Sequence, residues 1–164
     1  MVNIAKTDWS KIKCIVYDFD GVMTDNRVLL SQDGKESVFV NRSDGWAIER
    51  FREAGISQLI LSTEENPVVS ARAKKLKLEV LHGVKDKGSV LSAWCIEKSI
   101  SLSEVLYIGN DLNDMPAFEI AGVKCAPKDA EPEILAIADW ISEKNGGYGV
   151  VRDLYRCIMK YINK

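Results

Sequence analysis

The stretch YDFDGVMTD, residues 17–25, places three carboxylates directly after an apolar run. Asp18 and Asp20 are two residues apart at the end of an extended segment, so both side chains leave the same side of the chain. Two neighbouring carboxylates repel each other unless a cation or a proton lies between them. We therefore expect a centre that binds a cation or a proton at the end of a buried strand. A turn role explains Asp25 equally well.

A calcium loop does not explain the stretch. Such a loop needs the pattern D-x-[DN]-x-[DN]-G and a Glu at its twelfth position, whereas here Gly21 comes too early and Val22 and Met23 fill ligand positions. A second group of acids contains Asp111, which would complete an oxygen-rich site suited to Mg²⁺. This ion takes few protein carboxylates and completes its shell with water and substrate phosphate oxygens.

The elements that must position these acids alternate between strand and helix. The hydrophobic pattern and capping residues predict a β-hairpin over 26–40, around the turn QDGK, and a helix that begins at the N-cap Ser43-Asp44 and stops at Gly55. Further strands are predicted at 12–17, 58–62, 79–81, 105–108, 123–125 and 139–141, with further helices at 67–77, 86–98, 113–121, 131–137 and after the segment KNGGYG. This alternation predicts one α/β domain over 1–164, with a mostly parallel, Rossmann-like sheet covered by helices on both faces.

Polar clusters follow four of these elements. They are Asp18/Asp20, Ser62-Thr63-Glu64, Lys85-Asp86-Lys87 and Asn110-Asp111-Leu112-Asn113-Asp114. In parallel sheets, functional groups gather at the carboxyl ends of the strands, so the four clusters predict a single site.

The order of these motifs resembles the haloacid dehalogenase (HAD) superfamily of phosphohydrolases. The resemblance rests on D-F-D-G-V with T-D following, a strand ending in Ser, a Lys after a short strand, and G-N-D-x-N-D. It covers essentially the whole chain. Each motif alone is weak, but their order and spacing together are specific.

The resemblance implies a role for each motif residue. Asp18 would be the nucleophile that forms an aspartyl-phosphate, and Asp20 the acid and then the base. Ser62 and Lys87 would hold the phosphoryl oxygens, although a Ser at a strand end is usually a cap and a Lys near a helix start is usually solvated. Asp111 would bind Mg²⁺ together with Asp18 and the backbone carbonyl of Asp20.

The same resemblance implies supporting roles for two further motif residues. Asp114 would orient a metal-bound water or Lys87, and Asn110 would stand near the metal without binding it. Many family members have Asp where Asn110 stands, which removes one charge from the surroundings of the site.

The spacing leaves no room for an inserted cap domain, so the chain resembles the capless sugar-acid phosphatases. These form homotetramers in which hairpins equivalent to 26–40 associate and a C-terminal segment, here 145–164, reaches a neighbouring site. The segment NGGYGVVRDL is similar to that family's G-G-x-G-x-x-R-E, which would make Arg152 a contact for a substrate anion. A flexible loop followed by a solvated Arg is the alternative.

The substrate would be a 2-keto-3-deoxy sugar-acid phosphate. Octulosonate 8-phosphate phosphatases of this family commonly show T-G-R after the second strand, where this chain has Ser62-Thr63-Glu64. Glu64 and Lys75, with Thr63 beside them, resemble enzymes acting on a nonulosonate 9-phosphate (2-keto-3-deoxynonulosonate or N-acetylneuraminate). We expect that substrate first, with 3-deoxy-D-manno-octulosonate 8-phosphate as the alternative. Lys75 lies in a basic helix face and is equally explained as solvated.

Two other functions compete with a phosphatase. A receiver-type signalling domain also has an acidic pocket, a Ser/Thr and a Lys, but its acceptor Asp follows a middle strand and it lacks an acid/base such as Asp20. A non-catalytic oligomerisation module, similar to the C-terminal domain of some CMP-sialate synthetases, can lose catalytic residues. This chain keeps the motif residues, which favours an enzyme.

The composition limits which partners and which cellular compartment we expect for this chain. A net charge of −2 gives no reason to expect binding to nucleic acid or to an anionic membrane. The sequence has no apolar run of transmembrane length and no signal-peptide pattern. The four widely spaced cysteines favour reduced thiols and a cytoplasmic location.

Overall fold

The computed structural model describes residues 7–162 and contains a six-stranded parallel sheet in the order β5-β4-β1-β6-β7-β8. The strands are β1 (Cys14–Tyr17), β4 (Ser57–Leu61), β5 (Glu79–Leu81), β6 (Val105–Ile108), β7 (Val123–Ala126) and β8 (Trp140–Ile141). β1 lies in the middle, paired with β4 on one side and β6 on the other. The predicted α/β fold with a parallel sheet is confirmed.

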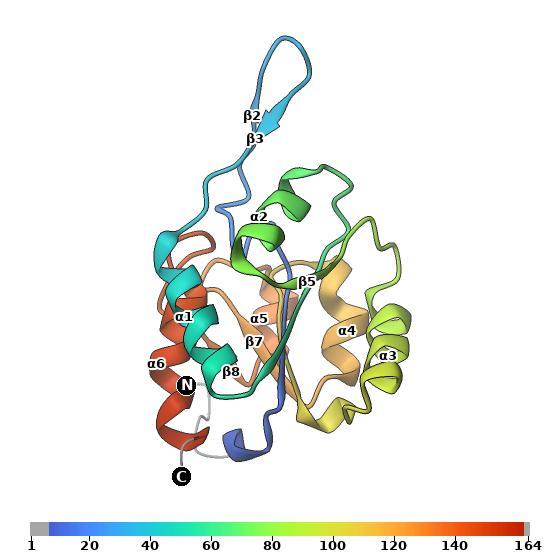
Figure 1. Ribbon diagram of the computed structural model, residues 1–164, viewed down its shortest axis with the longest axis vertical. Helices are drawn as coiled ribbons and strands as arrows, with labels where there is room; N and C mark the ends of the chain where they lie inside the picture. The colour runs from blue at the N-terminus through green and yellow to red at the C-terminus, as the bar shows by residue number, and fades with distance from the viewer. Residues whose placement is uncertain (1–6, 163–164) are drawn as a thin grey trace.

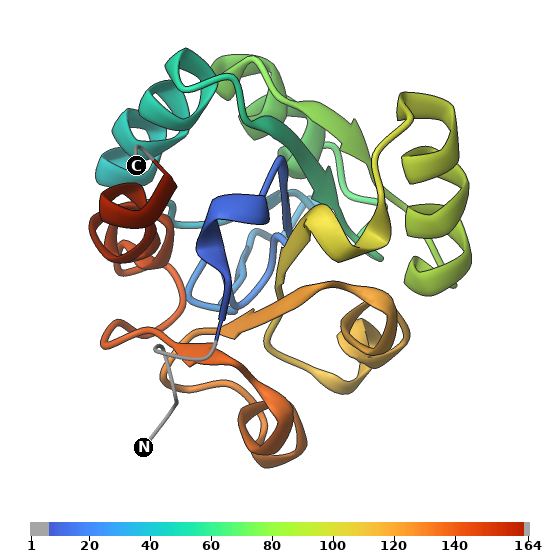
Figure 2. The same ribbon diagram turned by 90° about the horizontal axis from the view of Figure 1, so that it is seen from below.

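Helices cover both faces of the sheet (Figures 1 and 2). The helices are α1 (Arg42–Glu53), α2 (Val68–Leu76), α3 (Lys87–Lys98), α4 (Met115–Ile120), α5 (Pro132–Ile137) and α6 (Val150–Ile162). α1, α2 and α6 pack on the face that carries Ile15 and Tyr17 of β1, whereas α3, α4 and α5 pack on the face that carries Cys14 and Val16. β1 is therefore buried on both faces, which explains its uninterrupted apolar sequence.

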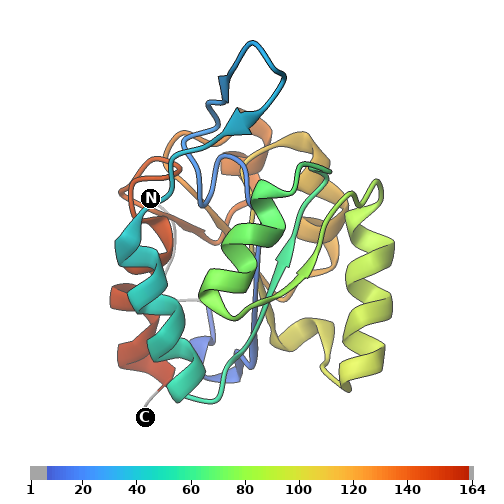
Figure 3. The ribbon, with the colours of Figure 1, turned by 45° about the horizontal axis from the view of Figure 1, so that its top comes forward.

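The predicted hairpin forms, but its strands are short. β2 (Leu29–Leu30) and β3 (Glu36–Ser37) pair antiparallel, and one isolated bridge between Thr24 and Val40 closes the base. The hairpin projects from the body of the molecule beyond the carboxyl ends of the strands (Figures 1 and 3). Outside it, the described residues contain no inserted cap domain between the sheet strands.

The start of α1 differs from the prediction. The helix begins at Arg42 and its N-cap is Asn41, whose side chain accepts from Ser43 N at 2.9 Å. Asp44 is thus not the cap but a buried residue inside the first turn. Its carboxylate instead accepts from Arg152 N, near the start of α6, at 3.0 Å. The sequence predicted a local cap, and the side chain makes a contact across 108 residues.

The remaining boundaries agree closely with prediction. The strand predicted at 12–17 starts at Cys14, and the helix predicted over 113–121 divides into a 3₁₀ turn (Leu112–Asp114) and α4. All four cysteines are free, as predicted. Every helix within residues 7–162 falls short of the length and hydropathy that a membrane span requires. Residues 1–6 and 163–164, the ends of the predicted domain and C-terminal segment, lie outside the described residues.

Candidate active site

A pocket of about 230 Å³ lies at the carboxyl ends of β1, β4 and β6, under the base of the hairpin. Residues from all these elements meet there because parallel strands end at one edge of the sheet. The lining residues are Asp18, Asp20, Asn26, Val28, Ser62, Thr63, Glu64, Asn110, Asp111 and Asn113. Three of the four predicted polar clusters thus line one pocket, and the fourth reaches it through Lys87, whose ammonium contacts Asp18.

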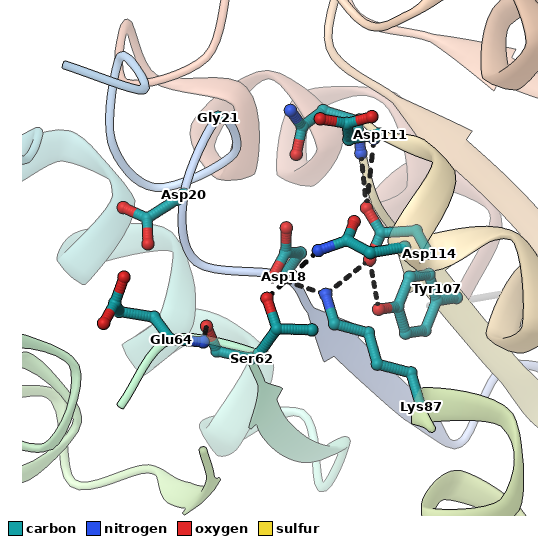
Figure 4. Close-up of polar contacts among 12 residues, drawn as sticks. Asp18, Asp20, Gly21, Ser62, Glu64, Lys87, Tyr107, Asp111 and Asp114 are labelled. Atoms are coloured by element: carbon teal, nitrogen blue, oxygen red, sulfur yellow. Dashed lines mark hydrogen bonds and ion pairs between the residues drawn. The ribbon is translucent and has the colours of Figure 1, made fainter. Parts of the chain in front are cut away.

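Lys87 connects the pocket to its support. This lysine is completely buried, and its Nζ donates to Asp18 Oδ1 at 2.7 Å and to Asp114 Oδ1 at 2.6 Å. Figure 4 shows the ammonium between the two carboxylates. Asp86 caps α3 by accepting from Ser89 N at 3.1 Å, which fixes Lys87 as the first helical residue. An ammonium has three protons, so one remains for a phosphoryl oxygen.

Asp114 is held from several sides. The hydroxyl of Tyr107, on β6, donates to Asp114 Oδ1 at 2.7 Å, and the backbone N–H groups of Asn110 and Asp111 donate to Asp114 Oδ2 at 2.8 and 3.2 Å. Both Tyr107 and Asp114 are fully buried. Four donors, counting Lys87, therefore fix one carboxylate in one orientation.

The charges in this network shift each other's pKa values. Burial and then the neighbouring Asp114 raise the pKa of Asp18 to about 7, while the Lys87 ammonium opposes the rise. Burial alone would lower the pKa of Lys87, but Asp18 and Asp114 outweigh it and raise the pKa above its usual value. Lys87 is thus held protonated beside Asp18. A cation near Asp18 would favour the ionised carboxylate further.

Asp20 lies in different surroundings. Its Oδ1 accepts from the Thr24 hydroxyl at 3.1 Å, and Figure 4 shows it facing Glu64 across the pocket. Burial raises the pKa of Asp20, and the charge of Glu64 adds to the rise, whereas the bond from Thr24 lowers it. A raised pKa suits a carboxyl that must deliver a proton near neutral pH. Sequence analysis did not single out Thr24, although the T-D pair after the first motif contains it.

Ser62 and Thr63 directly follow β4 and line the pocket. Ser62 is buried, and its Oγ accepts from Glu64 N at 3.2 Å. Since that bond uses a lone pair, the hydroxyl proton is free to meet an anion. Thr63 Oγ1 accepts from Asn113 Nδ2 at 3.1 Å, which joins this loop to the loop after β6.

The residues near Asp18 fit a magnesium ion. The side-chain amide of Asn110 lies against Asp18 Oδ2 and the carbonyl oxygen of Asp20; turned one way, its nitrogen donates to them at 3.2 and 2.7 Å. Turned the other way, three oxygens converge with no proton between them. A hard cation binds such a cluster of oxygens and completes its shell with water.

Asp111 lies less close to this cluster. Its Oδ1 accepts from Leu112 N at 2.6 Å and so caps the short 3₁₀ turn, and in Figure 4 it lies at the top of the view, away from Lys87. Within residues 7–162, no three Asp, Glu, His or Cys side chains converge in a way that could hold a metal ion alone. The predicted metal role of Asp111 stays a prediction, and the geometry adds Asn110 as a second candidate ligand. Asn110 comes two residues after the end of β6, at the carboxyl edge of the sheet, and this position marks it in the sequence as a candidate.

The first motif turns sharply because Gly21 has φ +79° and no side chain. A Cβ there would approach Asn110 Nδ2 to 2.1 Å. On the other side of the turn, Gly147 N donates to Val22 O at 3.0 Å, and a Cβ on Gly146 would approach Gly21 O to 2.1 Å. The glycine-rich segment before α6 is thus part of the support of the first motif.

Lys75 and Arg152 lie elsewhere in the single chain. Lys75 lines a cavity of about 260 Å³ between α1 and α2, and Arg152 lines one of about 610 Å³ beside α1 and α6. Neither residue lines the pocket that contains Asp18, whereas Glu64 does. The predicted substrate contacts of Lys75 and Arg152 stay predictions that would need a second copy of the chain.

Comparisons with known proteins agree with the fold. Residues 50–154 match the haloacid dehalogenase-like hydrolase family. A solved structure from Streptomyces avermitilis, described as an HAD family hydrolase, is 44% identical with a TM-score of 0.90, covering 93% of this chain and 87% of that one. The 3-deoxy-D-manno-octulosonate 8-phosphate phosphatase from Moraxella catarrhalis, in complex with magnesium, phosphate and KDO, is 29% identical with a TM-score of 0.93, covering 99% and 94%.

A third similar protein is longer than this chain. The N-acylneuraminate cytidylyltransferase of Oncorhynchus mykiss is 29% identical over 152 residues, which are 90% of this chain and 35% of the relative. The chain thus spans about a third of that relative's length. The family match covers more than half of the chain, and the S. avermitilis protein exceeds 30% identity over most of it. This chain belongs to the haloacid dehalogenase-like hydrolase family.

Proposed function

We propose that this chain is a Mg²⁺-dependent phosphatase that hydrolyses a sugar-acid phosphate through an aspartyl-phosphate. The observation that carries the proposal is the buried ion-pair network, in which Lys87 joins Asp18 to Asp114 at the edge of a pocket that also contains Asp20. It supplies an oriented carboxylate nucleophile, a cation for the phosphoryl group and a second carboxyl with a raised pKa.

The chemistry then has two steps. A carboxylate oxygen of Asp18 attacks phosphorus, the bond from phosphorus to the ester oxygen breaks, and Asp20 gives its proton to the departing alcohol. Asp20 next takes a proton from a water molecule, which attacks the aspartyl-phosphate and releases inorganic phosphate and free Asp18. Ser62 and Lys87 hold the phosphoryl oxygens in both steps, since each has a proton that no acceptor within residues 7–162 uses.

Asp18, the carbonyl oxygen of Asp20 and the side chain of Asn110 or Asp111 would hold the metal. When bound, Mg²⁺ offsets the negative charge that gathers where phosphate meets carboxylate. Magnesium is bound in the similar M. catarrhalis structure. These roles of the site residues are proposals that the geometry supports.

The substrate class follows from the similar proteins and from the pocket. A relative named as an octulosonate 8-phosphate phosphatase matches nearly the whole chain. This similarity supports 3-deoxy-D-manno-octulosonate 8-phosphate better than the nonulosonate 9-phosphate that Glu64 and Lys75 suggested from the sequence. Glu64 does line the pocket, which keeps the nonulosonate ester as the second substrate to test.

Assembly would complete the site. The hairpin over 26–40 would associate with copies of itself in a tetramer, and the segment 145–164 of one chain would cover the pocket of another. Lys75 would then meet the substrate of a neighbour, whereas Arg152 lies stacked on Trp46 of its own chain. The exposed apolar side chains of the hairpin support this arrangement.

A non-catalytic module is the second candidate. The similarity to part of an N-acylneuraminate cytidylyltransferase favours it, since a domain attached to an enzyme can serve assembly alone. The complete network around Lys87 favours catalysis instead, because a module without activity has no need for two carboxylates around a buried ammonium.

A phosphate-release assay tests the function. Wild type and Asp18→Asn are compared on octulosonate 8-phosphate and nonulosonate 9-phosphates, with Mg²⁺ and with excess chelator. We expect turnover only with metal and a loss of at least about 1,000-fold in the variant, because the nucleophile is lost.

Asp139→Asn is a matched control, since Asp139 accepts from Lys124 N at the opposite edge of the sheet and should keep wild-type turnover. Equal turnover by Asp18→Asn, or no metal-dependent turnover on any ester, would show that this chain is not such a phosphatase.

A further inference from the structure

The cavity beside α1 and α6 has no role in the proposed chemistry, although at about 610 Å³ it is much larger than the pocket that contains Asp18. Its volume is in the range of small-molecule sites in proteins. The lining residues are Arg42, Ser43, Trp46, Lys144, Tyr148, Gly149, Arg152 and Arg156. α1 and α6 lie side by side in Figure 1, so one wall comes from each helix and the rim comes from the loop before α6.

The charge of this cavity is one-sided. Four cationic side chains line it, and no carboxylate does, in a chain whose net charge is −2. The ten ion pairs found among residues 7–162 include neither Arg42, Lys144, Arg152 nor Arg156. Cations that lie in a concave surface and have no carboxylate partner attract a negatively charged ligand.

The nearby acids do not neutralise these cations. Asp44 is buried under the start of α6 and accepts from Arg152 N. Asp153 accepts from the Ser142 hydroxyl at 2.7 Å and from Glu143 N at 3.0 Å. Glu49 pairs with Arg52. Each of these carboxylates is directed to another partner, and none lines the cavity.

One of the cations is held in place. The guanidinium carbon of Arg152 lies 3.4 Å from the centre of the Trp46 ring, and Tyr155 meets the edge of that ring at 5.0 Å between centroids. A guanidinium stacked on an aromatic ring keeps its N–H groups directed outward in its own plane. Little conformational freedom is then lost when an anion binds.

The rim is fixed as well. Asn41 Nδ2 donates to Gly147 O at 3.4 Å, and Gly146 N donates to Asp129 Oδ1 at 2.8 Å. At Gly149 φ is +94°, and a Cβ there would come within 3.1 Å of Ser43 Oγ. The cavity is thus formed before any ligand arrives.

We propose that this cavity is a binding site for a small anion with two or more clustered negative charges, carried by phosphate or carboxylate groups, and that it is separate from the pocket of Asp18. Arg42, Lys144 and Arg156 surround the ligand, and the stacked Arg152 gives it a planar pair of donors. Exposed Tyr148 offers one apolar wall.

Calorimetric titration with tripolyphosphate and with citrate tests this site, and the two probes distinguish phosphate from carboxylate ligands. Chelator is present, so that Mg²⁺ cannot bring either probe to Asp18. The test variant Arg42→Gln/Lys144→Gln removes two exposed cations that line the cavity, and Lys11→Gln/Lys98→Gln removes the same charge elsewhere. We expect the apparent Kd of at least one probe to rise at least tenfold in the test variant and to stay within twofold in the control.

Two further measurements keep the result specific. Asp111→Asn alters the other pocket and should leave binding unchanged. The probe should change tryptophan fluorescence in wild type and not in Trp46→Phe, because its negative charge binds beside the Trp46 ring and the Arg152 guanidinium stacked on it. The proposal is wrong if neither probe binds, or if the Arg42→Gln/Lys144→Gln variant binds as tightly as wild type. Turnover in that variant is expected at the wild-type level, which confirms that it folds.

Discussion

At the scale of single residues, the ammonium of Lys87 decides the electrostatics of the site. Two buried carboxylates, Asp18 and Asp114, are tolerated because this one cation touches both. The four donors on Asp114 hold that carboxylate in place, and Lys87 therefore points at Asp18. The quality of the nucleophile depends on residues that never touch it.

Tyr107→Phe tests this dependence. Loss of the hydroxyl leaves Asp114 Oδ1 with one donor fewer, so Lys87 and Asp18 become less well fixed. We expect kcat to fall by roughly tenfold, with KM changed little, because supporting residues of this kind act on orientation. Steady-state kinetics on the substrate identified above measures the separation of kcat from KM.

Tyr17→Phe is the matched control. Tyr17 is equally buried, lies on the neighbouring strand β1 and donates to Gln58 Oε1 at 2.7 Å, on the opposite face of the sheet. Both variants remove one hydrogen bond from a buried tyrosine hydroxyl and should lose a similar stability, on the order of 1 kcal/mol. If both lowered kcat equally, or neither did, the hydroxyl of Tyr107 would have no special role.

The sequence predicted the pocket residues better than their supports. Asp18, Ser62 and Lys87 were predictable because each belongs to a polar cluster after an apolar strand or beside a helix start. Tyr107 was not, because a tyrosine inside an apolar strand gives no sign of which buried group its hydroxyl meets. The position of Asn110 facing Asp18 likewise depends on the turn at Gly21, which places the two loops together.

At the scale of elements, Asp44 joins two helices that are far apart in the sequence. It lies in the first turn of α1, yet it accepts from the backbone of α6. Among the described residues 7–162, Asp44 Oδ2 finds no hydrogen-bond partner. Burial raises the pKa of Asp44 to about 6, although the bonds from α6 and the charge of Arg72 act in the opposite direction.

Asp44→Asn should flatten part of the pH dependence of stability. A raised pKa means that the native state holds this proton more tightly than the unfolded state, so stability falls as the pH rises from about 4 to 6 and then stays lower. The difference between 3.8 and about 6 corresponds to roughly 3 kcal/mol. An asparagine oxygen can still accept from Arg152 N and carries no charge at any pH.

Urea unfolding at pH 4.5 and pH 7 measures the effect. Relative to wild type, Asp44→Asn is expected to gain stability at pH 7 and little at pH 4.5. Asp33→Asn, on the exposed turn of the hairpin, serves as control. A constant difference between Asp44→Asn and wild type at both pH values would contradict the prediction.

The helices and strands themselves were largely predictable, since apolar periodicity and capping residues act locally. The exact strand 79–81 and the cap at Asp86 are examples. The N-cap of α1 was not predictable, because Asn41 and Ser43 both suit that position. Asp44 is not the cap because it contacts α6 instead. Sequence rules describe residues that are neighbours along the chain, whereas the contact between Asp44 and α6 joins residues far apart in the sequence.

At the scale of the whole molecule, the hairpin is the part that the fold of one chain does not explain. Leu29 and Leu30 are each 65% exposed and Phe39 is 71% exposed, on an element that stands clear of the body (Figure 3). A two-stranded hairpin is only marginally stable in water by itself. Its apolar side chains therefore favour association with copies of the same element, as we propose for 26–40.

The variant Leu29→Lys/Leu30→Lys tests this association. Burial of one leucine side chain contributes about 1.5–3 kcal/mol, and four lysines brought together in each pair of hairpins would repel. We measure the mass by size-exclusion chromatography with light scattering. We expect wild type to have a mass near four times the chain mass of 18.3 kDa, and the variant a mass near that of one chain.

Kinetic measurements on the same variant show whether assembly affects substrate binding or the chemical step. Both leucines are exposed, and neither lines the pocket of Asp18, so the single chain should keep its fold and its Lys87 network. If a neighbouring chain completes the site, KM should rise by at least tenfold with a smaller change in kcat, since binding contacts are lost and the nucleophile is not.

Ile96→Lys, a change at an exposed position on α3, is the control and should leave both mass and kinetics unchanged. A monomeric wild type, or a monomeric variant with wild-type KM, would show that the hairpin does not complete the site of a neighbour.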